Sequence, residues 1–325
     1  RQHPGPVPVH EGGESRGRVL ILGIPYFGER LARELGELGW QARYFPHPGR
    51  NLRAWARIAW QVMRADVLDL LSSRVEKWSP QDWMMRFRRK PVVIHWVGTD
   101  VKVARAAHRR GRVSVRIAER AQHWCDAPWL VDELRTIGLV AEFVALPITL
   151  HEGRSPALPS EFGVLMYCPR EEAYREVFDL ETMLRLPPEF PDAKFYLVAS
   201  PPESLPGPLP ENLEALPWVE EMDAMYRKST VLVRLTHHDG QSFMVAEALS
   251  RGRYVIWTHP MGGCIQARTF EEVVAAIRQV KERHDDGSLS TNLEGRRAAT
   301  GLYGKSRPLM DIDERLRILV AAQGG

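Results

Sequence analysis

Short apolar runs alternate with longer amphipathic stretches along nearly the whole chain. The apolar runs predict buried strands, and the stretches between them, with apolar positions three and four residues apart, predict helices. This alternation is typical of βαβ units around parallel sheets, so we predict an α/β protein. In the first half we expect strands at Arg18–Gly23, Gln41–Phe45, Val67–Leu71, Val92–Trp96 and Val140–Ala145, and helices at Gly28–Leu38, Leu52–Met63 and Pro128–Ile137.

The alternation stops over Leu146–Ser160, which holds three prolines and no sustained period, and then restarts. Such a segment is typical of a linker between domains. Two α/β halves joined by a linker also predict a ligand cleft between them. In the second half we expect strands at Gly163–Tyr167, Lys194–Ala199, Val231–Leu235 and Tyr254–Trp257, and helices at Val219–Lys228, Ser242–Ser250, Thr269–Lys281 and Asp311–Ala322.

A length of 325 residues is more than one core usually supports, which agrees with two domains. We expect a disordered tail over residues 1–15, because it lacks apolar periodicity. The predicted organisation then runs through a first α/β domain over 16–148, a linker over 149–160, a second α/β domain over 161–307 and a C-terminal helix over 308–325 that packs back across the cleft.

Composition excludes several classes of protein. Hydrophobic residues make up 44% of the chain, too many for a disordered protein, and no apolar run approaches the ~20 residues of a membrane-spanning helix. Three cysteines, Cys125, Cys168 and Cys264, stand far apart, so we expect neither a disulfide framework nor a zinc site, and a reducing, cytoplasmic location fits. A net charge of +3 is too small to argue for nucleic acid, and we expect no nucleic-acid partner.

The most informative chemistry lies after the predicted strand that ends at Leu235. A polar turn holds Asp239 and Gly240, and a helix is expected to begin at Ser242, a favoured N-cap residue. Main-chain N–H groups at a helix start suit a phosphate. Glu247 is the lone charge within Phe243–Leu249, so a buried carboxylate there needs a partner such as a ribose diol. The alternative is that Glu247 faces solvent and the turn has no further role.

Asp239 and Glu247 are separated by seven residues, and a glycine, an alanine after Glu247 and a following strand accompany them. This stretch resembles the Glu-x7-Glu motif of retaining glycosyltransferases of family 4. Other pieces that resemble the family occur in the expected order, so the resemblance covers roughly residues 18–282: His95–Asp100, Ala127–Gly138, Leu165–Arg170, Ala193–Val198 and Trp257–Gly263. It implies the GT-B fold, in which two Rossmann-like domains face each other across a cleft, the first binding the acceptor and the second the nucleotide sugar.

The resemblance also implies roles for individual residues. Glu247 would hold the ribose of the donor and Asp239 the donor sugar, although Asp239 is one methylene shorter than the usual glutamate. Arg170 and Arg175 would neutralise the donor diphosphate, with Pro169 in place of the usual glycine and Arg175 in place of a lysine. The remaining donor contacts would come from the same loop, at His238, Gly240, Gln241 and Ser242. The alternative for both arginines is a solvated polar face among neighbouring glutamates.

We predict that His95 acts in catalysis together with Asp239 and Glu247. The histidine of the family lies directly before the glycine, where this chain has Val97, so His95 is displaced by two positions and could equally be a core residue. The acceptor is expected to contact residues at two predicted strand ends of the first domain, namely Tyr26, Gly98, Thr99 and Asp100.

The predicted function is a retaining glycosyltransferase that moves a hexose from a UDP- or GDP-sugar to the hydroxyl of an acceptor carbohydrate or lipid-linked sugar. No metal and no further cofactor is expected. Asp311-Ile-Asp313 is similar to the Asp-x-Asp of metal-dependent enzymes, yet it is expected to N-cap the last helix. Two alternatives stay open: a nucleotide-sugar-binding protein without catalysis, and an epimerase of the nucleotide sugar.

The first half also combines tryptophan with arginine. Tryptophan and arginine on amphipathic helices suit an anionic lipid surface, and they suit an ordinary exposed helix as well. Peripheral contact with the inner face of the cell membrane is therefore a further hypothesis, and it rests on Trp55, Trp60, Trp83, Arg86, Phe87, Arg88, Arg89 and Lys90, with six more arginines between Arg105 and Arg120.

Overall fold

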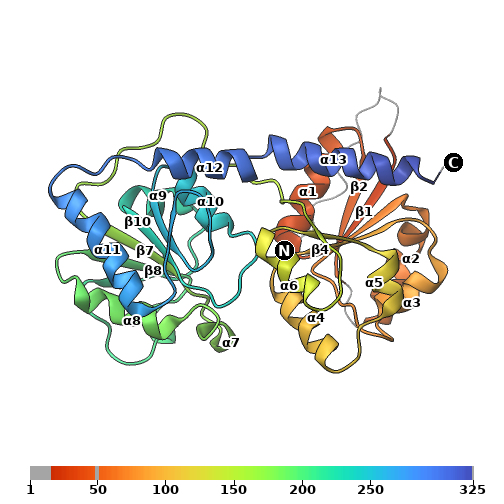
Figure 1. The fold of residues 1–325 in the computed structure, drawn as a ribbon, viewed down its shortest axis with the longest axis horizontal. Helices are drawn as coiled ribbons and strands as arrows, with labels where there is room; N and C mark the ends of the chain where they lie inside the picture. The colour runs from red at the N-terminus through yellow and green to blue at the C-terminus, as the bar shows by residue number, and fades with distance from the viewer. Residues whose placement is uncertain (1–15, 48–50, 324–325) are drawn as a thin grey trace. The chain divides into compact units, whose positions relative to one another are not determined.

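The computed structural model describes residues 16–47 and 51–323, without the side chain of Leu52. The disordered tail predicted over residues 1–15 lies outside these described residues. The chain divides into two compact units (Figure 1). Within the described residues, unit 1 comprises 16–147, Asp239–Gln241 and 305–323, and unit 2 comprises Ile148–His238 and Ser242–Gly304. In the described part of the chain, no helix is both long enough and apolar enough to cross a membrane.

Unit 1 contains a parallel six-stranded sheet in the order β2-β1-β3-β4-β5-β6. Its strands are β1 (Arg18–Gly23), β2 (Gln41–Pro46), β3 (Val67–Leu71), β4 (Val92–Trp96), β5 (Gln122–Cys125) and β6 (Glu142–Phe143). Its helices are α1 (Pro25–Glu37), α2 (Leu52–Arg64), α3 (Pro80–Phe87), α4 (Thr99–Arg109), α5 (Val115–Arg120), α6 (Pro128–Arg135) and α13 (Ser306–Ala321).

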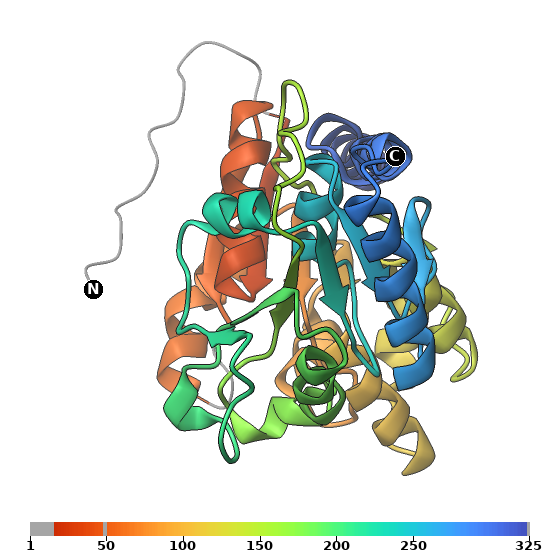
Figure 2. The same cartoon turned by 90° about the vertical axis from the view of Figure 1, so that its left-hand side faces the viewer.

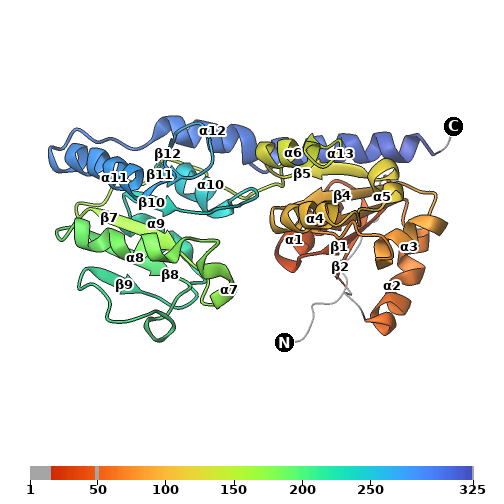
Figure 3. The same cartoon turned by 60° about the horizontal axis from the view of Figure 1, so that its bottom comes forward.

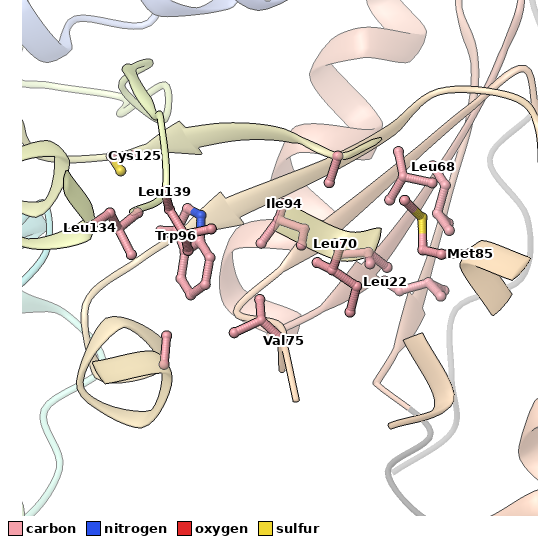
Figure 4. Close-up of a cluster of buried hydrophobic side chains, with 14 of the residues drawn as sticks. Leu22, Leu68, Leu70, Val75, Met85, Ile94, Trp96, Cys125, Leu134 and Leu139 are labelled. Atoms are coloured by element: carbon pink, nitrogen blue, oxygen red, sulfur yellow. The ribbon is translucent and has the colours of Figure 1, made fainter. Parts of the chain in front are cut away.

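Both faces of the first sheet are covered, because its central strands are apolar at almost every position. Alternate residues such as Leu68, Leu70, Ile94 and Trp96 pack into a core closed by α2 to α6 (Figure 4). The residues between them point to the other face, where α1 and α13 pack. His95 is one of these, since it lies between Ile94 and Trp96 in β4.

Unit 2 contains a second parallel six-stranded sheet, in the order β12-β11-β10-β7-β8-β9. Its strands are β7 (Gly163–Tyr167), β8 (Lys194–Val198), β9 (Leu213–Ala215), β10 (Val231–Arg234), β11 (Tyr254–Trp257) and β12 (Cys264–Gln266). Its helices are α7 (Glu172–Arg175), α8 (Leu180–Glu189), the short 3-10 helix η1 (Pro202–Ser204), α9 (Met222–Lys228), α10 (Phe243–Ser250), α11 (Phe270–Asp285) and α12 (Leu293–Tyr303).

Helices cover both faces of this second sheet (Figure 2). One face packs against α8 and α11 through Val164, Val231 and their alternate neighbours. The other face carries α9 and α10, with α12 packed against α10. The chain therefore leaves the adjacent strands β7 and β10 toward opposite faces of the sheet, a topology that favours a ligand at their carboxyl ends.

The α/β class with two parallel sheets is confirmed, and most predicted strands are present. The predicted strand Val140–Ala145 was wrong in extent, because only Glu142–Phe143 pairs, with β5. Strand β5 itself was missed, since its polar residues Gln122 and His123 hide the apolar pattern. The last helix begins at Ser306, with Pro308 in its first turn where a missing N–H costs nothing. Asp311 and Asp313 therefore lie inside α13 and do not cap it.

Asp313 instead fixes α13 to the rest of unit 1. Its buried carboxylate accepts hydrogen bonds from Trp40 Nε1 and Arg16 Nη1, each at 2.7 Å, and from Arg317. Burial by itself raises the pKa of Asp313, but these hydrogen bonds outweigh it and hold the pKa below its usual value. The ionised carboxylate of Asp313 is thus the form that holds α13 in place.

Asp313→Ala is expected to lower the free energy of unfolding by about 1–3 kcal/mol at neutral pH, because the buried Trp40 N–H loses its acceptor. Since the folded pKa is lowered, this contribution is present above the unfolded value of about 4 and is lost as the pH falls through the folded value. Urea denaturation as a function of pH measures it, with Glu314→Ala on the exposed side of α13 as the control. Equal stability of the two variants at neutral pH would contradict the role of Asp313.

Candidate functional site

The carboxyl ends of β7 and β10 are where the topology of unit 2 favours a ligand. Arg170 follows β7 by three residues, and the polar segment that contains His238, Asp239 and Ser242 follows β10. Most of the predicted donor-binding residues therefore come from the two segments that leave these adjacent strands.

Glu247 lies on α10, which begins after the N-cap Ser242, whose Oγ accepts from Val245 N–H at 3.4 Å. Its side chain is half-buried, and Oε2 accepts a hydrogen bond from the hydroxyl of Tyr226 at 2.8 Å. The guanidinium of Arg251 stacks over the Tyr226 ring at 4.8 Å and donates to the Glu247 carbonyl oxygen. The hydroxyl of Tyr226 thus orients the Glu247 carboxylate. Tyr226 lies on the buried side of α9, and the sequence pattern did not single it out.

The two arginines predicted to bind the diphosphate differ in their exposure and in their hydrogen bonds to the protein. Arg170 is 73% exposed, with its Nε 4.0 Å from the carboxylate of Glu171. Arg175 donates through Nη2 to the carbonyl oxygen of Ser204 at 2.6 Å, so part of its guanidinium is committed to the main chain. Arg170 is therefore the better placed of the two to meet an anion.

Arg234, the last residue of β10, is a further cation that was missed. It is buried, and its guanidinium lies 4.8 Å from the ring of Phe178 and 5.3 Å from that of Tyr167. Its place in an otherwise apolar strand was a signal, because a buried charge needs specific partners. It adds positive charge at the end of the β7–β10 pair.

A close approach of two glycines fixes the segment Asp239–Gln241 within unit 1. Gly98 has φ +114, and a Cβ there would lie 2.9 Å from Gly240 N. A Cβ on Gly240 would lie 2.5 Å from the Val97 carbonyl oxygen and 2.8 Å from Asp126 Oδ1. No other residue type fits either position without displacement, so both predicted site glycines serve main-chain packing.

Side chains of unit 1 hold the same segment from both sides. Leu146 N–H donates to Gln241 Oε1, and Gln241 Nε2 donates back to the Leu146 carbonyl oxygen, both at 2.8 Å. Trp129 Nε1 donates to the Asp239 carbonyl oxygen at 2.7 Å. The predicted donor contact of Gln241 is thus corrected, because both ends of its amide are occupied by the main chain. The side chain of Asp239 is half-buried and keeps its predicted role as an expectation.

Two buried carboxyl groups lie under this segment. Asp126 accepts from the Gln241 N–H, yet burial raises its pKa well above the ordinary value, and the charges of Asp100 and Asp239 add to the effect. Burial likewise raises the pKa of Asp100 to about 7, although Val97 N–H and Val101 N–H donate to it. Asp100 therefore serves main-chain N–H groups in and before the first turn of α4, and the prediction that it contacts the acceptor is corrected by its burial.

His95 is also a core residue. Its ring is 0% exposed, Nε2 donates to the Val144 carbonyl oxygen at 2.9 Å, and Nδ1 lies 4.0 Å from the buried carboxylate of Asp69. A ring enclosed in this way cannot reach a substrate, so the predicted catalytic role of His95 was wrong. Of the predicted acceptor contacts, Tyr26 is 58% exposed and Thr99 is exposed, whereas Gly98 is covered by Gly240.

Comparisons with known proteins agree on the architecture. No family model matches the chain, and no curated protein matches it in sequence. Sucrose-phosphate synthase from Thermosynechococcus elongatus superposes with a TM-score of 0.70 at 13% identity, over 94% of this chain and 100% of that one. The chain has the GT-B fold.

Two further structures support this assignment. HepE from Anabaena, solved in complex with UDP-glucose, superposes with a TM-score of 0.63 at 11% identity over 92% of this chain and 99% of that one. A glycosyltransferase from Rickettsia africae gives 0.64 at 9% identity over 95% and 99%. The predicted GT-B fold is therefore confirmed, while the roles of the remaining site residues stay predictions.

Gly240→Ala is expected to lower the free energy of unfolding by about 1–3 kcal/mol, because its Cβ would overlap the Val97 carbonyl oxygen. Gly36→Ala is the matched control, since a Cβ on this exposed glycine of α1 meets nothing within 4 Å. It should leave the free energy unchanged or raise it by up to about 1 kcal/mol. Urea denaturation measures the free energy of unfolding of both variants. Equal stability of Gly240→Ala and Gly36→Ala would show that a Cβ at position 240 does not overlap the Val97 carbonyl oxygen.

Proposed function

We propose that the protein is a retaining glycosyltransferase, similar to those of family 4, that uses a nucleotide sugar as donor. The observation that carries the proposal is the pair of segments after β7 and β10, which bring Arg170, the start of α10 and Glu247 to the crevice of a Rossmann-like sheet. Cations and helix N–H groups suit a diphosphate, and an oriented carboxylate suits the hydroxyls of a ribose.

In this proposal the nucleotide of the donor is held by side chains and main-chain groups of unit 2. Glu247, supported by Tyr226, accepts hydrogen bonds from the ribose. Arg170 and the main-chain N–H groups at the start of α10 face the diphosphate, which gains charge as the glycosidic bond breaks. Asp239 contacts the donor sugar and favours the positive charge that develops on its ring.

The transfer step needs no group beyond donor and acceptor. The bond between the anomeric carbon and the diphosphate oxygen breaks, and the acceptor oxygen forms a bond to the same face of that carbon. The acceptor proton passes to a phosphate oxygen of the leaving diphosphate. We therefore propose retention and independence of metal. In the described residues no group of three or more His, Cys, Asp or Glu is arranged to hold a metal ion.

We propose UDP- or GDP-sugars as donors and a carbohydrate or lipid-linked sugar as acceptor. HepE, which shares the fold, is solved with UDP-glucose, which makes UDP-glucose the first donor to test. Tyr26 and Thr99 are the remaining candidates for acceptor contacts.

Glu247→Ala is expected to weaken nucleotide binding by about 1.5–3 kcal/mol, because a charged acceptor of hydrogen bonds is lost. Calorimetric titration with UDP and GDP measures this, and release of sugar from the matching donors measures turnover. Glu247→Gln should bind better than Glu247→Ala because it keeps the acceptor oxygen. Glu282→Ala, on the exposed side of α11 in the same unit, is the control and should bind as the original protein does.

Unchanged affinity in a folded Glu247→Ala protein would remove Glu247 from the donor site. Binding of UDP-sugars without any transfer to a panel of saccharide acceptors would instead favour a binding protein on this fold. An inverted anomeric product would contradict retention while leaving the donor site in place.

A further inference from the structure

We infer that unit 1 docks on an anionic lipid bilayer through an aromatic surface formed by α2 and α3. The two helices lie next to each other (Figure 3) and enclose a groove of 530 Å³. The groove is lined mainly by large apolar side chains, namely Trp55, Met63, Trp78, Trp83, Met84 and Phe87. We call these six residues, together with the neighbouring Trp60 of α2, the aromatic surface.

The large apolar side chains of the aromatic surface are unusually exposed to water. Trp78 is 76% exposed, Trp60 64% and Phe87 65%, and Met63 and Trp83 are each more than half exposed. Soluble monomers seldom gather so many large apolar side chains in one exposed patch unless the patch contacts a partner or a membrane. Tryptophan in particular is favoured at the boundary between lipid headgroups and acyl chains, because its ring is apolar and its N–H is polar.

Cations surround the aromatic surface. Arg86 lies over the rings of Trp78 and Trp83 at 5.4 and 5.9 Å, and Arg64 lies over Trp60 at 5.2 Å. Helix α2 adds Arg53 and Arg57 on its exposed side and contains no acidic residue. Within the described residues, no ion pair engages Arg53, Arg57, Arg64 or Arg86.

The one carboxylate on α3, that of Asp82, is engaged mainly by groups outside the aromatic surface, although the charge of Arg86 also acts on it. Asp82 is buried and accepts from the hydroxyl of Ser114 at 2.5 Å and from Arg116 at 2.9 Å. Exposed cations around an apolar patch are complementary to anionic headgroups above an apolar layer. A symmetric pair of chains would instead bring these arginines against their own copies, which repel each other.

Vesicle sedimentation of the full chain tests the inference without reference to its activity. Vesicles of phosphatidylcholine alone are compared with vesicles that also contain phosphatidylglycerol, at low and at high salt. We expect the protein to sediment with the anionic vesicles, and high salt should weaken the binding because it screens surface charge.

Two variants of α2 separate charge from apolar contact. Arg57→Gln/Arg64→Gln should reduce partition into anionic vesicles about 25-fold, roughly fivefold for each arginine removed near such a surface. Trp60→Ala should reduce it at least about tenfold, because a large aromatic side chain no longer enters the boundary layer. The controls are Trp218→Ala, which removes a tryptophan 70% exposed in unit 2, and Arg278→Gln/Arg297→Gln, also in unit 2. Both should bind like the original protein.

Three outcomes would overturn the inference. These are the absence of sedimentation with anionic vesicles, equal binding to neutral and anionic vesicles, and α2 variants that bind as well as the controls while circular dichroism shows them folded. Light scattering in lipid-free buffer tests whether a second copy of the chain binds the aromatic surface instead. A dimer that Trp60→Ala converts to a monomer would show this and also overturn the inference.

Discussion

The close approach of two main chains at Gly98 and Gly240 is the constraint that positions the segment Asp239–Gln241 within unit 1. Neither residue has room for a Cβ, so the turn after β4 and the segment Asp239–Gln241 meet main chain to main chain. Gln241 and Trp129 then fix the segment by hydrogen bonds to and from the main chain. The segment Asp239–Gln241 is therefore held in place within unit 1, and the Asp239 main chain is positioned by packing and by a hydrogen bond.

Burial divides the carboxylates near this segment into two classes. Asp100 and Asp126 are enclosed, and burial raises the pKa of both, while each accepts a hydrogen bond from the main chain. Glu247 and Asp239 are only half-buried, which leaves them able to meet a polar ligand. The proposed donor site would therefore use the second class, where solvent or a ligand can compensate the charge, and the first class supports the main chain.

The regular parts of the fold follow from local patterns, whereas the site depends on contacts between distant residues. Alternating apolar runs were enough to predict the central strands of both sheets, and the N-cap preference of serine was enough to predict that α10 begins next to Ser242. The same alternation places His95 on the opposite face of β4 from Trp96, but it cannot tell that α1 and α13 cover that face. The hydrogen bond from Trp40 to Asp313 joins residues 273 positions apart, and the pairing of Gln241 with Leu146 spans 95, so no local motif announces either.

Amide hydrogen exchange, with and without UDP-glucose, is the measurement that tests the central claim most directly. If the donor lies at the carboxyl ends of β7 and β10, exchange should slow in residues 168–172 and 242–248 and stay unchanged in α2 and α3. Slowed exchange confined to unit 1, or none with any UDP- or GDP-sugar, would contradict a donor site in unit 2.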